Sequence, residues 1–203
     1  MKLYMTPGAC SRAVHIALRE AELPFALEPV DLATHQTASG EDFTHVNPKG
    51  YVPLLDLEDG NKLTEVAAIL QFVADQNPKL HLAPASGTWD RYRLEELLNY
   101  VSTEIHKSFR PFVEPEATDA ERDRARARLE KRFEHLDRAV IGDQPFLTGD
   151  RFTVADAYLF VMLGWAEDNG IQIGRWPSLA RFREAVAARP AVRAAIEAED
   201  ALG

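Results

Sequence analysis

The chain has 203 residues, 46% hydrophobic and 27% charged, which is typical of a globular protein with one large domain or two small ones. A formal net charge of -9 argues against nucleic acid or an anionic membrane as partner, and no apolar run is long enough to predict a transmembrane helix. The single cysteine excludes an intrachain disulfide and fits a reducing compartment. Because Met1 leads straight into a predicted strand, we expect no signal peptide and a cytoplasmic location.

The first twenty residues predict a strand, a turn and a helix. Lys2–Met5 suits a strand, and the Pro and Gly of Thr6–Ala9 end it. A helix face then follows at the expected spacing, made of Val14, Ala17, Leu18 and Ala21. The only cysteine, Cys10, therefore lies at or next to the first turn of this helix.

A helix start favours a thiolate, since its backbone N–H groups are unpaired and carry a partial positive charge. A free thiol with a pKa of about 8.5 is only about 3% ionised at neutral pH, so a sulfur-handling site needs such help. The alternative is that Cys10 is a small buried hydrophobic residue. Its position alone leaves both interpretations open.

A second strand is predicted over Phe25–Val30, after a helix that ends near Leu23-Pro24. Strand, helix and strand within about 30 residues indicate a βαβ unit with a parallel strand pair. Residues 31–50 are polar and predict a loop with one short helix around residues 41–46.

A hairpin is predicted next. Tyr51–Leu57 and Asn61–Leu63 form its strands, joined through Glu58-Asp59-Gly60, because Asp-Gly between apolar runs favours a hairpin turn. A cis Pro53 would leave the backbone of Val52 to pair with something other than the sheet, and an ordinary trans proline at a sheet edge is the alternative.

After this hairpin the sequence predicts one helix, a linker and then only helices. Thr64-Glu65 cap a helix whose apolar side chains share one face, namely Ala68, Ile69, Phe72 and Val73. The Pro- and Gly-containing segment Asn77–Gly87 reads as a linker. We therefore divide the chain into a domain of residues 1–78, a linker of residues 79–87 and an all-helical domain of residues 88–203. Its predicted helices are Thr88–Val113, Asp119–Val140, Thr153–Asn169, Pro177–Ala188 and Pro190–Glu199.

Two further patterns bear on these helices. Thr153 and Asp156 form a capping box, and the apolar residues 157–163 predict a helix that runs through the core. The mixed charges of Glu121–Arg132 indicate a solvated helix face rather than a nucleic-acid site. No metal site is expected, because the histidines are too widely spaced: His15, His35, His45, His81, His106 and His135.

This order of elements resembles the glutathione transferase family over essentially the whole chain. The residues that carry the resemblance are Cys10-Ser11, Asn47–Gly50, Val52-Pro53, Thr64-Glu65 and the segment Gly149–Asp156. Asn99–Lys107 resembles the bacterial, cysteine-containing (beta-like) subgroup. In a regular helix Asn99, Thr103, His106 and Lys107 share one side, although a solvated helix face would explain that stripe equally well.

The resemblance implies an α/β thioredoxin-like domain that binds glutathione and an all-α domain that carries the electrophile. It implies catalytic roles for Cys10, Ser11, His106 and Lys107. It assigns glutathione contacts to Cys10, His35, Val52, Pro53, Glu65, Val66, Asn99 and His106, with Thr103 and Glu104 reaching glutathione of the neighbouring subunit in a homodimer. It places the electrophile between the domains, against Phe109, Phe112, Val113 and Trp165. Glutathione is then a co-substrate, with no further cofactor.

Two positions depart from the family pattern. Relatives often carry Ser or Gly where this chain has Val66, and the subgroup can have a lysine where it has His35. Three functions therefore remain open: conjugation of glutathione to small hydrophobic electrophiles, thiol–disulfide exchange through Cys10, and a non-catalytic ligand-binding role.

Overall fold

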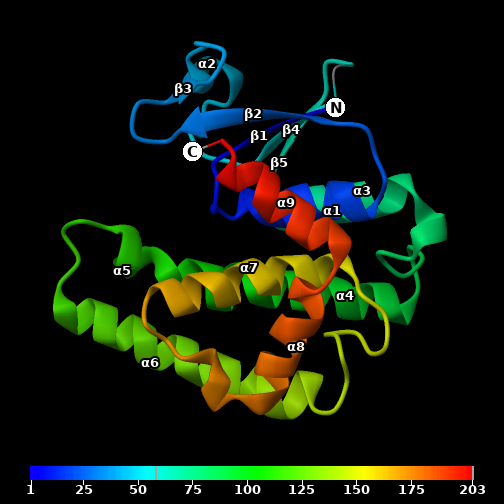
Figure 1. Ribbon diagram of the computed structural model, residues 1–203, viewed down its shortest axis with the longest axis vertical. Helices are drawn as coiled ribbons and strands as arrows, with labels where there is room; N and C mark the ends of the chain where they lie inside the picture. The colour runs from blue at the N-terminus through cyan, green and yellow to red at the C-terminus, as the bar shows by residue number, and fades with distance from the viewer. Residues whose placement is uncertain (58, 203) are drawn as a thin grey trace. The chain divides into compact units, whose positions relative to one another are not determined.

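The computed structural model describes residues 1–57 and 59–202, and it divides into two compact units (Figure 1). One unit holds Met1–Ala83 together with the C-terminal residues from Arg189 onward, and the other holds Pro84–Ala188. The boundary at Ala83 falls inside the predicted linker. The prediction differs in the last helix, α9 (Pro190–Asp200), which belongs to the first unit because it packs against α1 (Ser11–Glu20).

A five-stranded mixed sheet forms the centre of the first unit. Its order is β3-β2-β1-β4-β5, with β1 and β2 parallel and the other neighbours antiparallel. The predicted βαβ unit and hairpin are therefore confirmed, although Glu58 of the predicted turn lies outside the described residues. The strands are β1 (Lys2–Met5), β2 (Ala26–Asp31), β3 (Gln36–Thr37), β4 (Leu54–Asp56) and β5 (Lys62–Thr64).

Several predicted bounds need correction. The strand predicted from Tyr51 begins only at Leu54, because Pro53 has no N–H to give to a ladder, and the bond between Val52 and Pro53 is cis. Helix α1 ends at Glu20, earlier than predicted, and Glu22 adopts a φ of 55°. The short strand β3 was not predicted.

Helices complete the first unit. The predicted short helix is confirmed as α2 (Phe43–Val46), and α3 (Val66–Gln76) packs against α1 and β5. A 3-10 turn, η1 (Pro78–Leu80), lies in the predicted linker.

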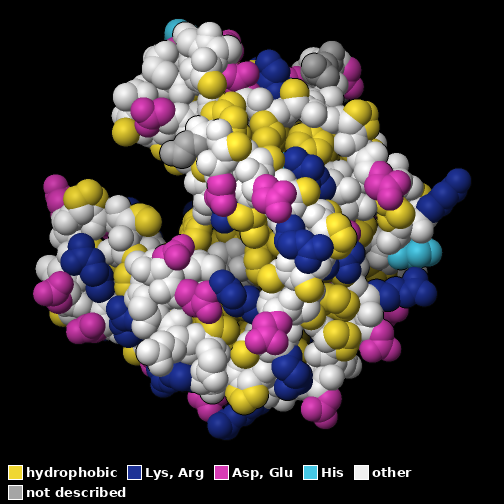
Figure 2. Space-filling model, in the orientation of Figure 1, with side chains coloured by type: hydrophobic (Ala, Val, Ile, Leu, Met, Phe, Trp, Pro, Cys, Tyr) yellow, Lys and Arg dark blue, Asp and Glu magenta, His cyan; other side chains and the backbone are white. Residues whose placement is uncertain are grey.

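The second unit contains the helices α4 (Trp89–Tyr100), α6 (Asp119–His135), α7 (Val154–Asp168) and α8 (Pro177–Ala187). Two short helical segments also belong to this unit. They are a π-helix after α6, η4 (Leu136–Ile141), and a 3-10 turn after α7, η5 (Ile173–Arg175). The charged run on α6 is a solvated face as predicted, because Ala125, Leu129 and Phe133 alone are buried on it. Figure 2 shows acidic and basic side chains interspersed over the visible face.

The helix predicted over residues 88–113 is wrong in one respect, because it changes helix type three times. After α4 the chain forms a π-helix, η2 (Val101–Ile105), then a 3-10 helix, η3 (His106–Phe109), and then α5 (Arg110–Val113). A π turn holds more residues than an α turn, so residues beyond it are rotated from their α-helical positions.

The predicted capping box at the start of α7 is confirmed. The Asp156 carboxylate accepts the Thr153 N–H at 2.6 Å and the Leu147 N–H at 2.8 Å. Every residue of α7 from Val154 to Leu163 is buried, so this helix does run through the core of its unit.

Candidate functional site

Cys10 lies at the N-cap of α1, and its side chain is almost fully buried, with 8% of the residue exposed. Its Sγ lies 3.7 Å from the carbonyl oxygen of Val52, to which the thiol donates. The sulfur therefore sits at a helix start and beside the backbone of Val52, the two features that the sequence predicts for a sulfur-handling site. Cys10 and Val52 both belong to the first unit.

Ser11 closes the turn that carries Cys10. Its buried hydroxyl accepts the Thr6 N–H at 3.2 Å and donates to the Thr6 carbonyl at 3.2 Å. A serine hydroxyl has only one proton, so donation to a thiolate would require it to give up the Thr6 carbonyl. The Cys10 thiol likewise has one proton, which it gives to the Val52 carbonyl, so either side chain would have to exchange its present bond for one to a thiolate.

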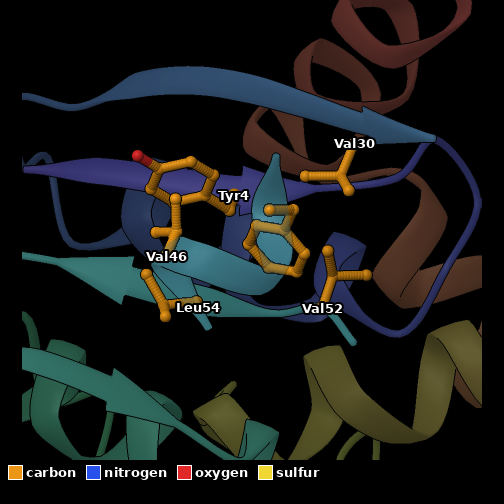
Figure 3. Packing of buried hydrophobic residues seen from close by; sticks show 6 residues of the cluster. Tyr4, Val30, Val46, Val52 and Leu54 are labelled. Atoms are coloured by element: carbon orange, nitrogen blue, oxygen red, sulfur yellow. The ribbon is translucent and has the colours of Figure 1, made fainter. Parts of the chain in front are cut away.

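Hydrophobic packing fixes the strand and loop on which Val52 lies. Figure 3 shows Tyr4, Val46, Val52 and Leu54 gathered in one cluster with Val30. The Tyr4 ring lies in this cluster and burial raises the pKa of its hydroxyl, in line with its position inside a strand.

A buried carboxylate from the other end of the chain holds the Cys10 turn, and the sequence analysis missed it. Glu199 of α9 is 0% exposed. Its Oε2 accepts the Gly8 N–H at 2.9 Å and Arg12 Nε at 2.7 Å, and its Oε1 lies 2.9 Å from His15 Nδ1. The segment around Cys10 is therefore fixed on both sides by one side chain.

The charge states in this network follow from its donors. Arg19 Nε donates to His15 Nε2 at 2.8 Å, so the imidazole proton is on Nδ1 and is donated to Glu199. Burial raises the pKa of Glu199, but the bonds from His15, Gly8 and Arg12 together outweigh it and bring the pKa below its ordinary 4.5. Glu199 is an anion that compensates Arg12.

A sequence signal for this network does exist. Val192, Ala195 and Glu199 recur at helical spacing and are all buried, so the apolar face of α9 contains one acid. An acid on an apolar face needs a buried partner. Arg189, just before α9, adds a second tie by pairing both Glu20 oxygens, at 2.6 and 2.7 Å.

Glu65, predicted to contact glutathione, stands at the N-cap of α3 with a φ of 71°. Its Oε1 accepts Lys49 Nζ at 2.8 Å and the Tyr51 hydroxyl at 2.9 Å. These bonds raise the pKa values of both partners. Val66 is the first residue of α3 and is buried, so its backbone is at a helix start as predicted.

His35, predicted to contact glutathione, adopts a φ of 56° and packs against Gly50. A Cβ at Gly50 would lie 3.3 Å from His35 Cε1, so a glycine suits this contact. Its buried Nδ1 makes no hydrogen bond with the residues that the structure describes. An unmet buried nitrogen is a reason to expect a polar partner here.

The predicted polar stripe of the second unit is not uniform. Asn99, Thr103 and Lys107 are exposed, whereas His106 is half-buried. The π-helix between Asn99 and His106 changes the register on which the stripe was predicted. Glu104 has a partner in its own unit, because its Oε2 accepts Arg132 Nε at 2.9 Å and Nη2 at 2.6 Å.

An aromatic cluster surrounds His106. Its Nδ1 lies 2.6 Å from the Tyr158 hydroxyl, and its ring centroid lies 5.1 Å from that of Trp165. Phe109 contacts Trp165 at 5.6 Å and Phe112 at 6.0 Å between centroids. Three of the four predicted electrophile-binding side chains therefore lie together beside His106.

The fourth of these side chains, Val113, is 72% exposed at the end of α5. The sequence analysis missed Tyr158, which is 1% exposed on α7 and looked like an ordinary core residue in an apolar run. A tyrosine in such a run needs a partner for its hydroxyl, and that was the available signal.

Two searches of the described residues gave negative results. Residues 1–57 and 59–202 contain no cluster of three or more His, Cys, Asp or Glu side chains that could hold a metal ion. Within the same ranges, no helix has the length and apolarity needed to span a membrane.

Comparison with known proteins identifies the family. The sequence models of the glutathione S-transferase N-terminal and C-terminal domains match residues 8–76 and 100–190. The chain is 42% identical to the glutathione S-transferase GstA of Escherichia coli, with 98% of each chain covered. Two solved structures are similar over 98% of this chain. One is a sphingomonad glutathione S-transferase complexed with glutathione, with 46% identity, 99% of its chain covered and a TM-score of 0.95. The other is a beta-class enzyme of Sphingomonas chungbukensis, with 45% identity, 98% covered and a TM-score of 0.94.

These matches span both units, so the predicted fold class, a thioredoxin-like α/β part followed by a helical part, is confirmed. The chain belongs to the glutathione S-transferase family and resembles its bacterial, beta-like members.

Proposed function

We propose that this glutathione transferase joins the glutathione thiolate to small hydrophobic electrophiles, as a detoxifying reaction, and that the Cys10 turn receives the glutathione sulfur. The observation that carries the proposal is the position of Cys10 Sγ at the start of α1, 3.7 Å from the Val52 carbonyl. A peptide ligand that pairs with the backbone of Val52 would bring its own thiol to the same helix start.

The reaction asks little of the protein beyond positioning and charge stabilisation. The glutathione thiol loses its proton to a base, and the thiolate attacks an electrophilic carbon to form a C–S bond. The displaced group leaves with the bonding electron pair. The start of α1 and the Cys10 thiol would stabilise the thiolate, and His106 with Lys107 would supply a base and a positive charge.

The remaining contacts follow from the site residues. Glu65 would accept the γ-glutamyl ammonium group in exchange for Lys49, and the backbone of Val66 would bind the adjoining carboxylate. His35 would bind the glycine carboxylate, which would provide a hydrogen-bond partner for its buried Nδ1. The apolar part of the electrophile would lie against Phe109, Phe112, Val113 and Trp165.

Calorimetric titration with glutathione tests the proposal in the wild type, Cys10→Ala and His106→Ala. We expect saturable binding that weakens about 2- to 10-fold in each variant, the equivalent of one lost hydrogen bond. His45→Ala is the matched control, since His45 is exposed and lies on another helix. Absence of saturation at millimolar glutathione would overturn the proposal, as would equal weakening in the control.

Thiol–disulfide exchange is the second candidate, favoured by a free cysteine beside Val52. The Cys10 thiolate would attack a glutathionylated disulfide and release the partner thiolate, and a second glutathione thiolate would then free Cys10 and form glutathione disulfide. Cys10→Ser should abolish this activity and leave conjugation intact. The third alternative, a non-catalytic binding protein, gains no support from the relatives quoted above, which are named as transferases.

We also propose a homodimer in the cytoplasm in which Asn99, Thr103 and Glu104 contribute to glutathione binding, Thr103 and Glu104 by reaching the neighbouring subunit. Arg132 holds Glu104 in a defined position for this role. Light scattering of the purified protein tests the dimer, and a monomer with full glutathione affinity would contradict it.

A further inference from the structure

The 3-10 helix η3 places aromatic side chains and cationic side chains on different faces of the segment from His106 to Arg110. In a 3-10 helix, residues three apart lie above one another. His106 and Phe109 therefore share a line, and both contact Trp165. Lys107 and Arg110 share the next line, so the segment has an aromatic face and a cationic face.

Helix α6 packs against this segment and adds two further cations. Arg124 and Arg128 are one helical turn apart and line a hollow of about 280 Å³ together with Lys107 and Arg110. The hollow also contains one acid, Glu121. Figure 2 shows basic and acidic side chains interspersed over the region where Figure 1 places α5 and α6.

The arginines of α6 differ in their partners. Arg122 bonds Asp119, Arg126 donates to the Asn169 carbonyl at 2.9 Å, and Arg132 pairs with Glu104. The side chains of Arg124, Arg128 and Lys107 make no hydrogen bond or ion pair with any residue of ranges 1–57 and 59–202.

The one acid in the hollow is already engaged. The Glu121 carboxylate accepts the Thr118 N–H at 2.8 Å and the Thr118 hydroxyl at 2.7 Å, in the capping box of α6. Two like charges four residues apart on a helix are mutually repulsive, so folding alone gives no reason for Arg124 and Arg128 to face one hollow.

A second hollow on the same unit provides a comparison. It has a volume of about 480 Å³, and its cations Lys131, Arg138 and Arg175 are matched by three acids, Glu130, Glu134 and Asp137. Arg138 pairs with Glu134 at 3.0 Å, and Arg175 pairs with Glu130. The first hollow has four cations and one acid on a chain whose net charge is -9. Arg110 pairs with Glu114, which lies outside the hollow. The excess positive charge therefore comes from Lys107, Arg124 and Arg128.

We propose that the hollow formed by Lys107, Arg110, Arg124 and Arg128 binds a small oxyanion with two or more negative charges, carried by carboxylate or phosphate groups. Arginine forks match such groups geometrically and form charge-assisted hydrogen bonds with them. The volume lies just below the usual range for ligand pockets, about 300 to 1,000 Å³, which favours a compact ligand. Lys107 has a part in both proposals, whereas Arg124 and Arg128 have none in the proposed glutathione site.

Titration calorimetry with citrate and with inorganic phosphate tests the proposal, in separate runs without glutathione and at ionic strength held constant with NaCl. The wild type should bind at least one probe saturably. The double variant Arg124→Ala/Arg128→Ala should bind it about 10-fold or more weakly, the loss expected for charge-assisted bonds. Tighter binding of citrate identifies a carboxylate site, and tighter binding of phosphate identifies a phosphate site.

The matched control is Lys131→Ala/Arg138→Ala, which removes the same charge from the balanced hollow. It should bind the probe within about 2-fold of the wild type, since general charge effects at constant ionic strength are small. No saturable heat with either probe would overturn the proposal, and so would equal weakening in the control. Glutathione titration of the Arg124→Ala/Arg128→Ala variant should match the wild type, so this proposal and the proposed transferase function can fail separately.

Discussion

The two segments proposed to carry the chemistry are held in place by different forces. The Cys10 turn is fixed by an ionised, fully buried Glu199, which receives bonds from Gly8, Arg12 and His15. The His106 segment is fixed by aromatic packing and one bond to the Tyr158 hydroxyl. A charge network fails badly when one member is lost, whereas packing around a phenol survives the loss of a hydroxyl. Damage to the first segment should therefore reduce stability, and damage to the second should change chemistry.

The largest effect is expected from Glu199→Ala. It leaves Arg12 and His15 without their buried partner, so the free energy of unfolding should fall by about 3 to 5 kcal/mol. Denaturant unfolding measures this. Glu197→Ala is the matched control, because Glu197 is an exposed acid on the same helix. Equal stability of the two variants would contradict the role of the network.

The pH dependence of stability is a second test of the contribution of Glu199. Because the pKa of Glu199 is below its ordinary 4.5 in the folded protein, its contribution is present above that pH and is lost as the pH falls below it. Between about pH 5 and 3, wild-type stability should fall more steeply than that of Glu199→Gln. Other carboxyls with lowered pKa, such as Asp31 and Asp42, remain in both proteins, so the difference isolates Glu199. Parallel curves would show that Glu199 is not linked to folding.

Tyr158→Phe tests the His106 segment. The variant keeps the ring that packs on His106 and removes the hydroxyl, so kcat/KM should fall about 2- to 10-fold while thermal stability stays close to that of the wild type. The pH profile of kcat/KM should shift as well, since one ring nitrogen of His106 loses its partner. An unchanged profile would mean that Tyr158 only fills space. Tyr92→Phe is a suitable control, because Tyr92 is 57% exposed in the same unit.

A smaller effect is expected at the second tie between α9 and α1. Arg189→Lys keeps the charge but loses the paired bonds to Glu20, so the free energy of unfolding should fall by about 1 kcal/mol. This is a fraction of the effect of Glu199→Ala, because Arg189 is 31% exposed. A loss as large as that of Glu199→Ala would mean that the Arg189–Glu20 pair stabilises the fold as much as Glu199 does.

The smallest stability change is expected from Lys49→Ala. Its pair with Glu65 is exposed on both sides, and such pairs contribute little to folding. Unfolding curves of the variant and wild type should overlap. Glutathione titration should show equal or tighter binding, since Lys49 no longer occupies the Glu65 carboxylate. Weaker binding would mean that Lys49 itself contacts the ligand.

Local patterns predicted much of this molecule. The helix start after Cys10, the hairpin, the Thr153 capping box and the buried course of α7 are properties of a few consecutive residues. The strand β3, only two residues long, has no such pattern, and the π-helix at Val101–Ile105 interrupts a sequence that is compatible with a regular helix. Propensity does not distinguish helix types whose hydrogen-bond spacing differs by one residue.

The charge network was missed because its members are distant in sequence. His15 and Glu199 are 184 positions apart, and each looks ordinary within its own helix. The partner of a buried acid is determined by which helices pack together, and α9 was assigned to the wrong domain. Tyr158 was missed for the same reason, since its partner His106 lies 52 positions away.

The placement of α9 also has a consequence for synthesis on the ribosome. Domains usually fold in order from the N-terminus as the chain emerges. Here Gly8 of the Cys10 turn is made 191 residues before Glu199, whose carboxylate fixes it. Until α9 is made, the N-terminal unit lacks the carboxylate that binds Arg12 and His15. The Cys10 turn therefore gains its last stabilising bonds well after its own residues have been synthesised.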